Sequence, residues 1–322
     1  MQHLRVGIIG AGAIGTALAV RLGTHGHDVS VVARGVRRVA IEVDGLVLHE
    51  GGERIVSRPR VACVDDLDDR DLVIVAVKSG ALPALLPQLA PVLRRDALLM
   101  PAINGLPWWY FQGEGGPLEG LSLQATDRGG VLKTLFRAEQ IVGCVVYSRA
   151  TMLPTGEVSV GGQQELNVGA IGGRPDLMPL VEGFARAGIA MTLEPDIRKA
   201  MWRKLIRNAA TNVVSALTGA TLEQMGRDGA ITRVITDIAT EVAGLAARVG
   251  RPVDPELEEL VAVLHQAGPF ATSMLQDVRA GREPELDSIA DAPLELAAKV
   301  GYAMPTLQTV TALLRGRLQA AA

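Results

Sequence analysis

The sequence predicts an α/β protein with an N-terminal doubly wound parallel sheet in residues 1–195 and a C-terminal all-helical domain in residues 196–322. Three observations lead to this fold class. Short β-rich runs alternate with helical stretches in the first half, a glycine-rich turn follows the first run, and the composition becomes helical beyond Pro195. A chain of 322 residues that is 48% hydrophobic can fill the cores of two such domains.

Four apolar runs are predicted as buried strands of the parallel sheet: residues 6–9, 29–32, 72–77 and 97–100. An aspartate-rich segment, residues 65–71, directly precedes the third run. We expect this segment to form a solvated loop and not a metal site, because adjacent carboxylates in a turn seldom converge on one ion.

A second β-rich region follows at residues 141–171, with glycine-rich turns at 154–156 and 161–162, and is predicted to continue the sheet as antiparallel hairpins. Further along, Asp176 can cap a helix that runs to about Ala187, and residues 191–193 form a last short strand. Pro195 and Asp196 open a long helix to about Leu217. The domain boundary is therefore expected near Pro195.

Charge and composition exclude several classes of partner. The net charge is −3 and no basic run occurs, so neither nucleic acid nor an anionic membrane is expected as a partner. No signal-peptide pattern and no apolar run of about 18 residues is found. Cys63 and Cys144 lack CxxC spacing, and the five histidines match no metal-binding spacing. We expect a cytoplasmic protein without a bound metal.

The glycine-rich turn matches the dinucleotide fingerprint G-x-G-x-x-G. It consists of Gly10, Ala11, Gly12, Ala13, Ile14 and Gly15. The motif follows a predicted strand and opens a predicted helix, which is the context that a Rossmann-type unit requires. The alternative is a glycine-rich turn without a ligand, but this context favours a bound dinucleotide, with its pyrophosphate at the helix N-terminus.

The end of the second strand indicates which dinucleotide binds. NAD-binding units usually place an acidic residue there to accept the ribose 2′-hydroxyl. This chain has Arg34 instead, with Arg37 and Arg38 close behind. A guanidinium group suits a 2′-phosphate, so the predicted cofactor is NADPH. The alternative is that Arg34 only faces solvent at the end of its loop.

Lys204, Asn208 and Asn212 form one polar stripe on the long helix, because residues four apart lie on the same face. Only five of the 32 basic residues are lysines, and only four asparagines occur in the chain. Asparagine is also a poor residue for a helix interior. A solvent-facing stripe is the alternative, but the rarity of both residue types here favours a functional site.

The motifs together closely resemble the ketopantoate reductase (2-dehydropantoate 2-reductase) family over nearly the whole chain. They are the glycine turn, Ala76-Val77-Lys78-Ser79, Asn104-Gly105, Trp202-Arg203-Lys204 with Asn208 and Asn212, Ser273 to Asp277, and Glu285-Leu286-Asp287. The resemblance implies a Rossmann domain joined to a helical domain, with the active site in the cleft between them. It also implies NADPH-dependent reduction of a 2-oxo acid, with ketopantoate as the leading substrate and pantoate as its product.

The resemblance further implies a role for each matching residue. Lys204 would be the general acid, while Asn208 and Asn212 would hydrogen-bond the substrate. Ser273 would bind the substrate carboxylate, although it could instead be the N-cap of its helix. Glu285 would act with Lys204 and bridge the cofactor ribose and the substrate, although a surface carboxylate remains the alternative.

Three more residues are implied at the cofactor. Lys78 follows a buried strand at the position where the family uses lysine near the cofactor. Asn104 would contact both cofactor and substrate, and Ser148 would contact the cofactor. All three positions follow strand ends, where doubly wound sheets bind their ligands.

Two features depart from the family pattern and leave the substrate open. Ala290 and Asp291 stand where the family commonly has glycine, and an aromatic run occupies residues 108–111. This run could shape the substrate pocket, form a lid or subunit contact, or pack inside a loop. A reductase of another small oxo acid and a non-catalytic NADP-binding sensor are the alternative functions, and the long helices permit a homodimer.

Overall fold

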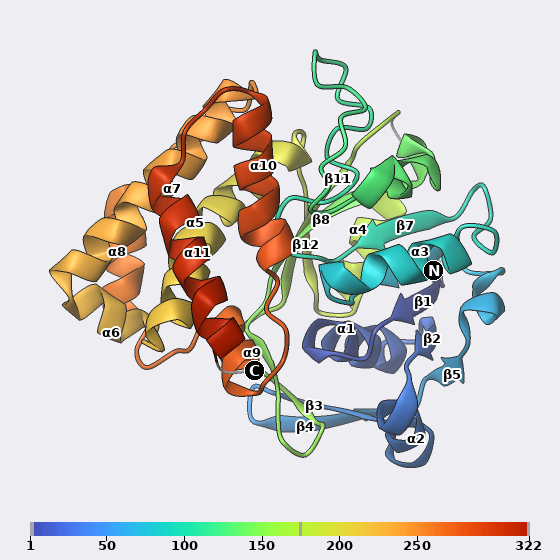
Figure 1. Ribbon diagram of the computed structural model, residues 1–322. Helices are drawn as coiled ribbons and strands as arrows, with labels where there is room; N and C mark the ends of the chain where they lie inside the picture. Colours follow the sequence, from blue (N-terminus) through green and yellow to red (C-terminus); the bar gives the residue numbers. More distant parts are fainter. Residues whose placement is uncertain (1–2, 174–175, 321–322) are drawn as a thin grey trace. The chain divides into compact units, whose positions relative to one another are not determined.

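The computed structural model describes residues 3–173 and 176–320, which form two compact units (Figure 1). The first unit contains the chain up to Ile103, together with Trp109–Leu121 and Val131–Ile197. The second contains Asn104–Trp108, Ser122–Gly130 and the chain from Arg198 onward. Two short segments from the first half of the chain therefore belong to the second unit.

A five-stranded, entirely parallel sheet forms the centre of the first unit. Its strands, in spatial order, are β5 (Arg60–Ala62), β2 (Asp28–Val32), β1 (Arg5–Ile9), β6 (Leu72–Val75) and β7 (Leu98–Pro101). The four predicted strands are confirmed, because apolar runs buried on both faces are typical of parallel strands. The three-residue strand β5 was not predicted.

Three helices follow strands of this sheet: α1 (Ala13–Thr24), α2 (Gly35–Asp44) and α3 (Leu82–Leu89). Helix α1 contacts β1 and β2 and also the strands of a second, smaller sheet, so it packs between the two sheets. Its buried face is made of small and branched residues such as Ala17, Leu18 and Val20. This packing holds the N-terminal end of α1 in place, where the helix begins within the glycine-rich turn.

The prediction that residues 141–171 continue the parallel sheet is wrong in part. Antiparallel pairing is confirmed for β9 (Ala150–Met152) with β10 (Val158–Val160), and for β8 (Val142–Tyr147) with β11 (Glu165–Ala170). However, β10 also pairs in parallel with a strand from residues 46–50. The β9–β10 pair and the β8–β11 pair belong to two different sheets, neither of which is the five-stranded parallel sheet. A single parallel bridge, between Leu99 and Ile141, joins the region to β7.

The two smaller sheets are completed by strands from either end of the first unit. The four-stranded sheet has the order β4 (Glu53–Ser57), β3 (Leu46–Glu50), β10 and β9. The three-stranded sheet has the order β12 (Ala190–Leu193), β11 and β8, so the predicted last strand is confirmed. The predicted helix after Asp176 is α4 (Met178–Arg186), and Asp176 Oδ1 accepts a hydrogen bond from the Met178 amide at 3.0 Å.

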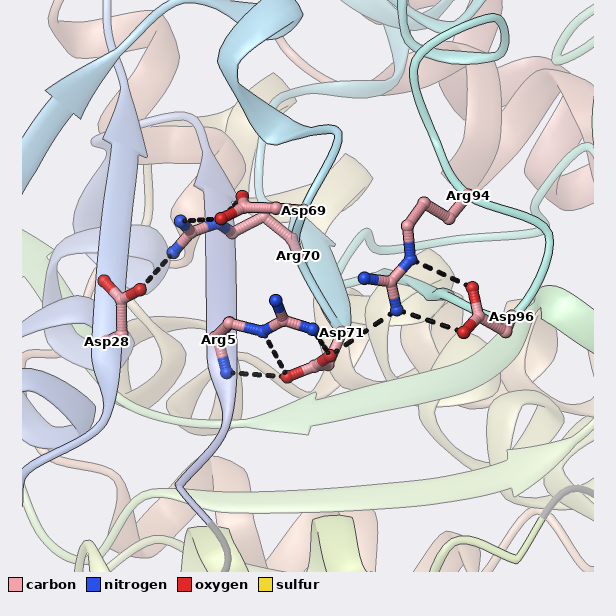
Figure 2. A network of polar contacts seen from close by, with 7 residues as sticks. All are labelled: Arg5, Asp28, Asp69, Arg70, Asp71, Arg94 and Asp96. Carbon is pink, nitrogen blue, oxygen red and sulfur yellow. Dashed lines mark hydrogen bonds and ion pairs between the residues drawn. The ribbon is translucent and has the colours of Figure 1, made fainter.

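The aspartate-rich segment is only partly a solvated loop. Figure 2 shows that Asp69 and Asp71 belong to a network of ion pairs. Asp71 accepts hydrogen bonds from the guanidinium of Arg5, at 3.1 and 2.6 Å, and from the Arg5 backbone amide. Arg70 bridges Asp69 and Asp28 and is only 3% exposed. The prediction of a solvated loop was wrong for these two aspartates, because Arg5 of β1 and Arg70 of the segment itself lie beside their carboxylates.

The second unit is helical, as predicted. It contains most of α5 (Ile197–Thr218), followed by α6 (Leu222–Arg227), α7 (Gly229–Arg248), α8 (Leu257–Gln266), α9 (Ser273–Arg279), a π-helical turn (Asp287–Asp291), α10 (Ala292–Lys299) and α11 (Pro305–Ala320). Side-chain caps set several helix starts, such as Thr221 for α6 and Asp228 for α7. Within residues 3–173 and 176–320, no helix is long and apolar enough to cross a membrane.

Candidate active site

The glycine-rich turn connects β1 to α1 in a conformation that only glycine tolerates. Gly10 has φ +104°, and a Cβ there would lie 2.5 Å from the Ala76 carbonyl oxygen. A Cβ on Gly15 would overlap with the Gly10 carbonyl oxygen. These two glycines therefore let the turn pack against the end of β6 and against itself.

Gly12 has a different role in the same turn. It is the N-cap residue of α1, and a Cβ built on it would meet no protein atom within 4 Å. Among the residues that the structure describes, no side chain caps the helix, and the first turn carries no acidic residue. The amides of Ala13 and Ile14 therefore begin a helix beside unfilled space, which is the arrangement that receives a dinucleotide pyrophosphate.

Arg37 braces this turn, a role that the sequence analysis did not assign. Its Nε donates to the Ala11 carbonyl at 3.1 Å, and the other guanidinium nitrogens donate to Thr16 Oγ1 at 3.0 Å and to the Gly156 carbonyl at 2.6 Å. Burial lowers the pKa of Arg37 from its usual value. The guanidinium thus links the glycine turn, helix α1 and the β9–β10 hairpin.

The three arginines after β2 have distinct surroundings. Arg38 donates to Glu42 Oε1 at 2.9 Å and to Cys63 Sγ at 3.4 Å. Arg34 is exposed at the N-cap position of α2, and within the described part of the chain its guanidinium group has no hydrogen-bonded or ionic partner. With Arg37 engaged at the turn, Arg34 is the arginine best suited to a ligand phosphate.

Lys78 and Ser148 lie just beyond other strand ends of the same unit. Lys78 follows β6 and precedes a short 3-10 turn, Ser79–Ala81. Ser148 follows β8, and its Oγ is buried without a hydrogen-bond partner among the described residues. A buried hydroxyl without a partner is costly, and a bound ligand would satisfy it. The glycine turn, Arg34, Lys78 and Ser148 therefore fit a nicotinamide dinucleotide.

The polar stripe on α5 forms as predicted. Lys204 and Asn208 are half-buried and Asn212 is only 5% exposed, while the neighbouring Leu205 and Ala209 are buried in the core. The stripe is therefore only partly exposed, and this burial favours a functional site over the solvent-facing alternative.

Lys204 contacts a residue from a distant part of the chain. Its Nζ donates a hydrogen bond to Asn104 Oδ1 at 2.6 Å, across 100 residues of sequence. Asn104 and Lys204 both belong to the second unit. An amide oxygen that accepts from an ammonium group holds that group in one orientation, which a positioned proton donor requires.

Ser273 and Glu285 lie elsewhere in the second unit. Ser273 is the exposed first residue of α9, and the N-cap is Thr272, whose Oγ1 accepts from the Leu275 amide at 3.2 Å. The N-cap alternative for Ser273 is therefore wrong. Glu285 is half-buried two residues before the π-helical turn, whereas the nearby Glu283 is exposed.

The aromatic run at residues 108–111 is buried. Trp108, Trp109, Tyr110 and Phe111 are each at most 3% exposed, and the rings of Tyr110 and Phe111 meet edge to face at 4.6 Å. Of the alternatives raised by the sequence, this arrangement favours packing within a loop over a mobile lid.

No group of three or more potential metal ligands occurs among residues 3–173 and 176–320. The first unit carries a dinucleotide turn at the end of a doubly wound sheet, and the second carries an oriented lysine on a helix; a nicotinamide-dependent oxidoreductase requires both features. Such enzymes transfer hydride and need a group that donates or accepts the accompanying proton.

Comparisons with known proteins identify the family. Residues 6–108 match the family model described as Ketopantoate reductase PanE/ApbA, and residues 196–318 match the model of its C-terminal region. A 2-dehydropantoate 2-reductase of Mesorhizobium japonicum is 34% identical over 316 residues, covering 97% of both chains. The chain belongs to the ketopantoate reductase family. Ketopantoate reductases use NADPH, which is therefore its cofactor.

Solved structures share the whole fold. A candidate ketopantoate reductase from Ralstonia solanacearum MolK2 is 32% identical, with a TM-score of 0.92 over 99% of both chains. A D-mandelate dehydrogenase solved with NADH and anilino(oxo)acetate is 19% identical, with a TM-score of 0.84 over 98% of both chains. The second similarity shows that the fold is common to proteins that differ widely in sequence.

Proposed function

We propose that this enzyme reduces 2-dehydropantoate to pantoate with NADPH, a step of pantothenate biosynthesis. The observation that carries the proposal is the hydrogen bond between Lys204 Nζ and Asn104 Oδ1. It holds an ammonium group in a fixed direction on a partly buried polar stripe, in a chain that otherwise uses arginine for most of its positive charges.

Lys204 is the proposed general acid. NADPH, when bound, supplies the hydride that adds to the substrate carbonyl carbon, so the carbonyl oxygen gains negative charge. The Lys204 ammonium stabilises that charge and then donates its proton to the oxygen. An arginine at this position would stabilise the charge but would hold its proton too tightly to donate it.

The neighbouring polar residues are proposed to hold the substrate. Asn208 and Asn212 lie one and two helical turns after Lys204 and offer amide groups to the substrate hydroxyl and carboxylate. Ser273, which does not cap its helix, offers a hydroxyl to the carboxylate. Asn104 would contact substrate and cofactor. Glu285 would bridge the cofactor ribose, the substrate and Lys204.

The first unit is proposed to supply the cofactor site. The amides that follow Gly12 would receive the pyrophosphate, and Arg34 would pair with the 2′-phosphate. Lys78 and Ser148 would complete the contacts, and the unpartnered Ser148 hydroxyl supports this assignment.

A direct experiment separates this substrate from other small oxo acids. NADPH oxidation is followed at 340 nm with 2-dehydropantoate and with a panel of 2-oxo acids of increasing size. The proposal requires the highest kcat/KM with 2-dehydropantoate. A higher kcat/KM with another oxo acid would assign a different substrate, and tight NADPH binding without any oxidation would indicate a sensor.

We also propose a cytoplasmic homodimer. Cys63 and Cys144 form no disulfide, which supports a reducing compartment, and the long helices with the alanine-rich C-terminus support self-association. Cell fractionation and light scattering of the purified protein test the two statements separately.

A further inference from the structure

The π-helical turn Asp287–Asp291 leaves one carbonyl without a donor in its own helix. The Ala292 amide donates to the Asp287 carbonyl five residues earlier, which is the π pattern. The same spacing would pair Ser288 with Pro293, and proline has no amide hydrogen. The Ser288 carbonyl is therefore directed to a donor outside the helix.

That donor is the amide of Leu106, at 2.8 Å from the Ser288 oxygen. Leu106 is fully buried and Ser288 is 1% exposed, so water does not compete for this hydrogen bond. The approach depends on Gly105, which has φ +85°. A Cβ at position 105 would overlap with the carbonyl carbon and oxygen of Ser288.

Two residues of the proposed active site adjoin this contact. Asn104, which accepts the hydrogen bond from Lys204, directly precedes Gly105. Glu285 lies three residues before Ser288 and two residues before the π-helical turn begins. All of these residues belong to the second unit.

We propose that the π-helical turn is a positioning device for the proton donor. The Ser288 carbonyl, which has no donor within its own helix, holds the Leu106 amide and thereby the backbone at Gly105. The position of this backbone sets the position of Asn104, whose amide oxygen orients Lys204. Gly105, Ser288 and Pro293 are then positioning residues, and Asn104 transmits their effect. This inference rests on the proposed function, because it takes Lys204 as the general acid.

The first test is Gly105→Ala in the full-length enzyme. The added methyl must push residues 104–106 away from Ser288, and a displacement of about 1 Å can reduce turnover on the order of 100-fold. We expect kcat to fall by about that factor while KM changes less than about threefold, because orientation of the donor matters mainly in the transition state. The matched control is Gly250→Ala, with φ +80° and no protein atom within 4 Å of the new Cβ. It should keep wild-type kcat.

A double-mutant cycle tests whether the effect passes through Asn104. In the Asn104→Ala background, Gly105→Ala should lower kcat no further, because the transmitting side chain is already gone. Additive losses would overturn the inference, since they would mean that Gly105 supports the enzyme in some other way.

Pro293→Ala tests the same device without adding strain. The new amide can donate to the Ser288 carbonyl and compete with Leu106, while alanine is a good helix former. We expect faster hydrogen exchange at the Leu106 amide and a severalfold lower kcat. Unchanged exchange and unchanged kcat would overturn the inference, and this variant decides the matter if Gly105→Ala does not fold. Failure of the proposed function is distinguishable, because Lys204→Ala would then retain turnover.

Discussion

The Arg37 guanidinium donates to the carbonyl oxygen of Ala11, inside the glycine-rich turn, at 3.1 Å. Two further hydrogen bonds tie the same side chain to Thr16 and to Gly156. The shape of the dinucleotide turn thus depends on a residue that lies outside the fingerprint, 22 positions after its last glycine.

Replacing Arg37 by methionine should loosen the turn. It removes three hydrogen bonds and leaves partly buried carbonyls without a donor, at a cost of about 2 kcal/mol in the free energy of unfolding. We expect a lower Tm and weaker NADPH binding, measured by thermal unfolding and by nucleotide fluorescence titration. Arg38→Met is the control, because Arg38 pairs with a half-exposed glutamate at the surface. Equal effects of the two substitutions would contradict the bracing role.

Gly12→Ala should separate cofactor binding from stability. The new methyl meets no protein atom within 4 Å, so the Tm should change by no more than a few degrees. It would occupy the space through which the pyrophosphate approaches the helix amides, so we expect NADPH affinity to fall on the order of 100-fold. Gly229→Ala, which also gains a methyl in open space, serves as the control. Retained NADPH affinity in Gly12→Ala would show that the dinucleotide binds elsewhere.

Arg34→Asp should change the preferred cofactor. The carboxylate repels a 2′-phosphate and can accept a hydrogen bond from the 2′-hydroxyl of NADH. Loss of a charge-assisted hydrogen bond costs about 1.5–3 kcal/mol, so NADPH affinity should fall by roughly 10- to 100-fold while NADH affinity rises. Calorimetry with both nucleotides measures the change. An unaltered ratio of the two affinities would remove Arg34 from the 2′-phosphate site.

The Arg5–Asp71 pair should contribute stability that depends on pH (Figure 2). Hydrogen bonding and charge attraction from Arg5 lower the pKa of Asp71 below its usual value. The pair therefore stabilises the fold above the unfolded-state pKa, and the contribution is lost as the pH falls through the lower folded-state pKa. Asp71→Asn should reduce the Tm at pH 7 by roughly 1–3 °C, because both side chains are about one-third or more exposed and solvent screens the pair.

The Tm difference between Asp71→Asn and the wild type should shrink below about pH 4 as the wild-type carboxylate becomes protonated. Asp68→Asn is the matched control, since Asp68 is exposed in the same aspartate-rich segment. A Tm difference for Asp71→Asn that stays constant from pH 7 down to pH 3 would exclude the pair as its source.

The sequence predicted those parts of the fold that have a simple local signal. Buried parallel strands are continuous apolar runs, and the fingerprint turn has a fixed glycine spacing, so both were found. The hairpin of β3 and β4 was missed because charged residues such as Glu50 and Arg54 interrupt its apolar pattern. The pairing of β10 with β3 joins segments about 110 residues apart, and no local pattern encodes it.

The candidate site was also predictable only where local sequence carries a signal. Helical spacing placed Lys204, Asn208 and Asn212 on one stripe, and the resemblance to the family supplied their roles, which stay predictions. The sequence could not show that Asn104 would contact Lys204, because that contact depends on tertiary packing. It also could not distinguish Arg34 from Arg37, since only burial and hydrogen bonding give the two arginines different surroundings.

The most direct test of the account is the steady-state rate of NADPH oxidation with 2-dehydropantoate in Lys204→Ala, alongside NADPH binding by the same variant. We expect kcat to fall by roughly 100- to 10,000-fold, the range that a general acid typically contributes. The Kd for NADPH should stay close to that of the wild type. Wild-type turnover in Lys204→Ala would contradict the account, because the reaction would then proceed without the proton donor on which it depends.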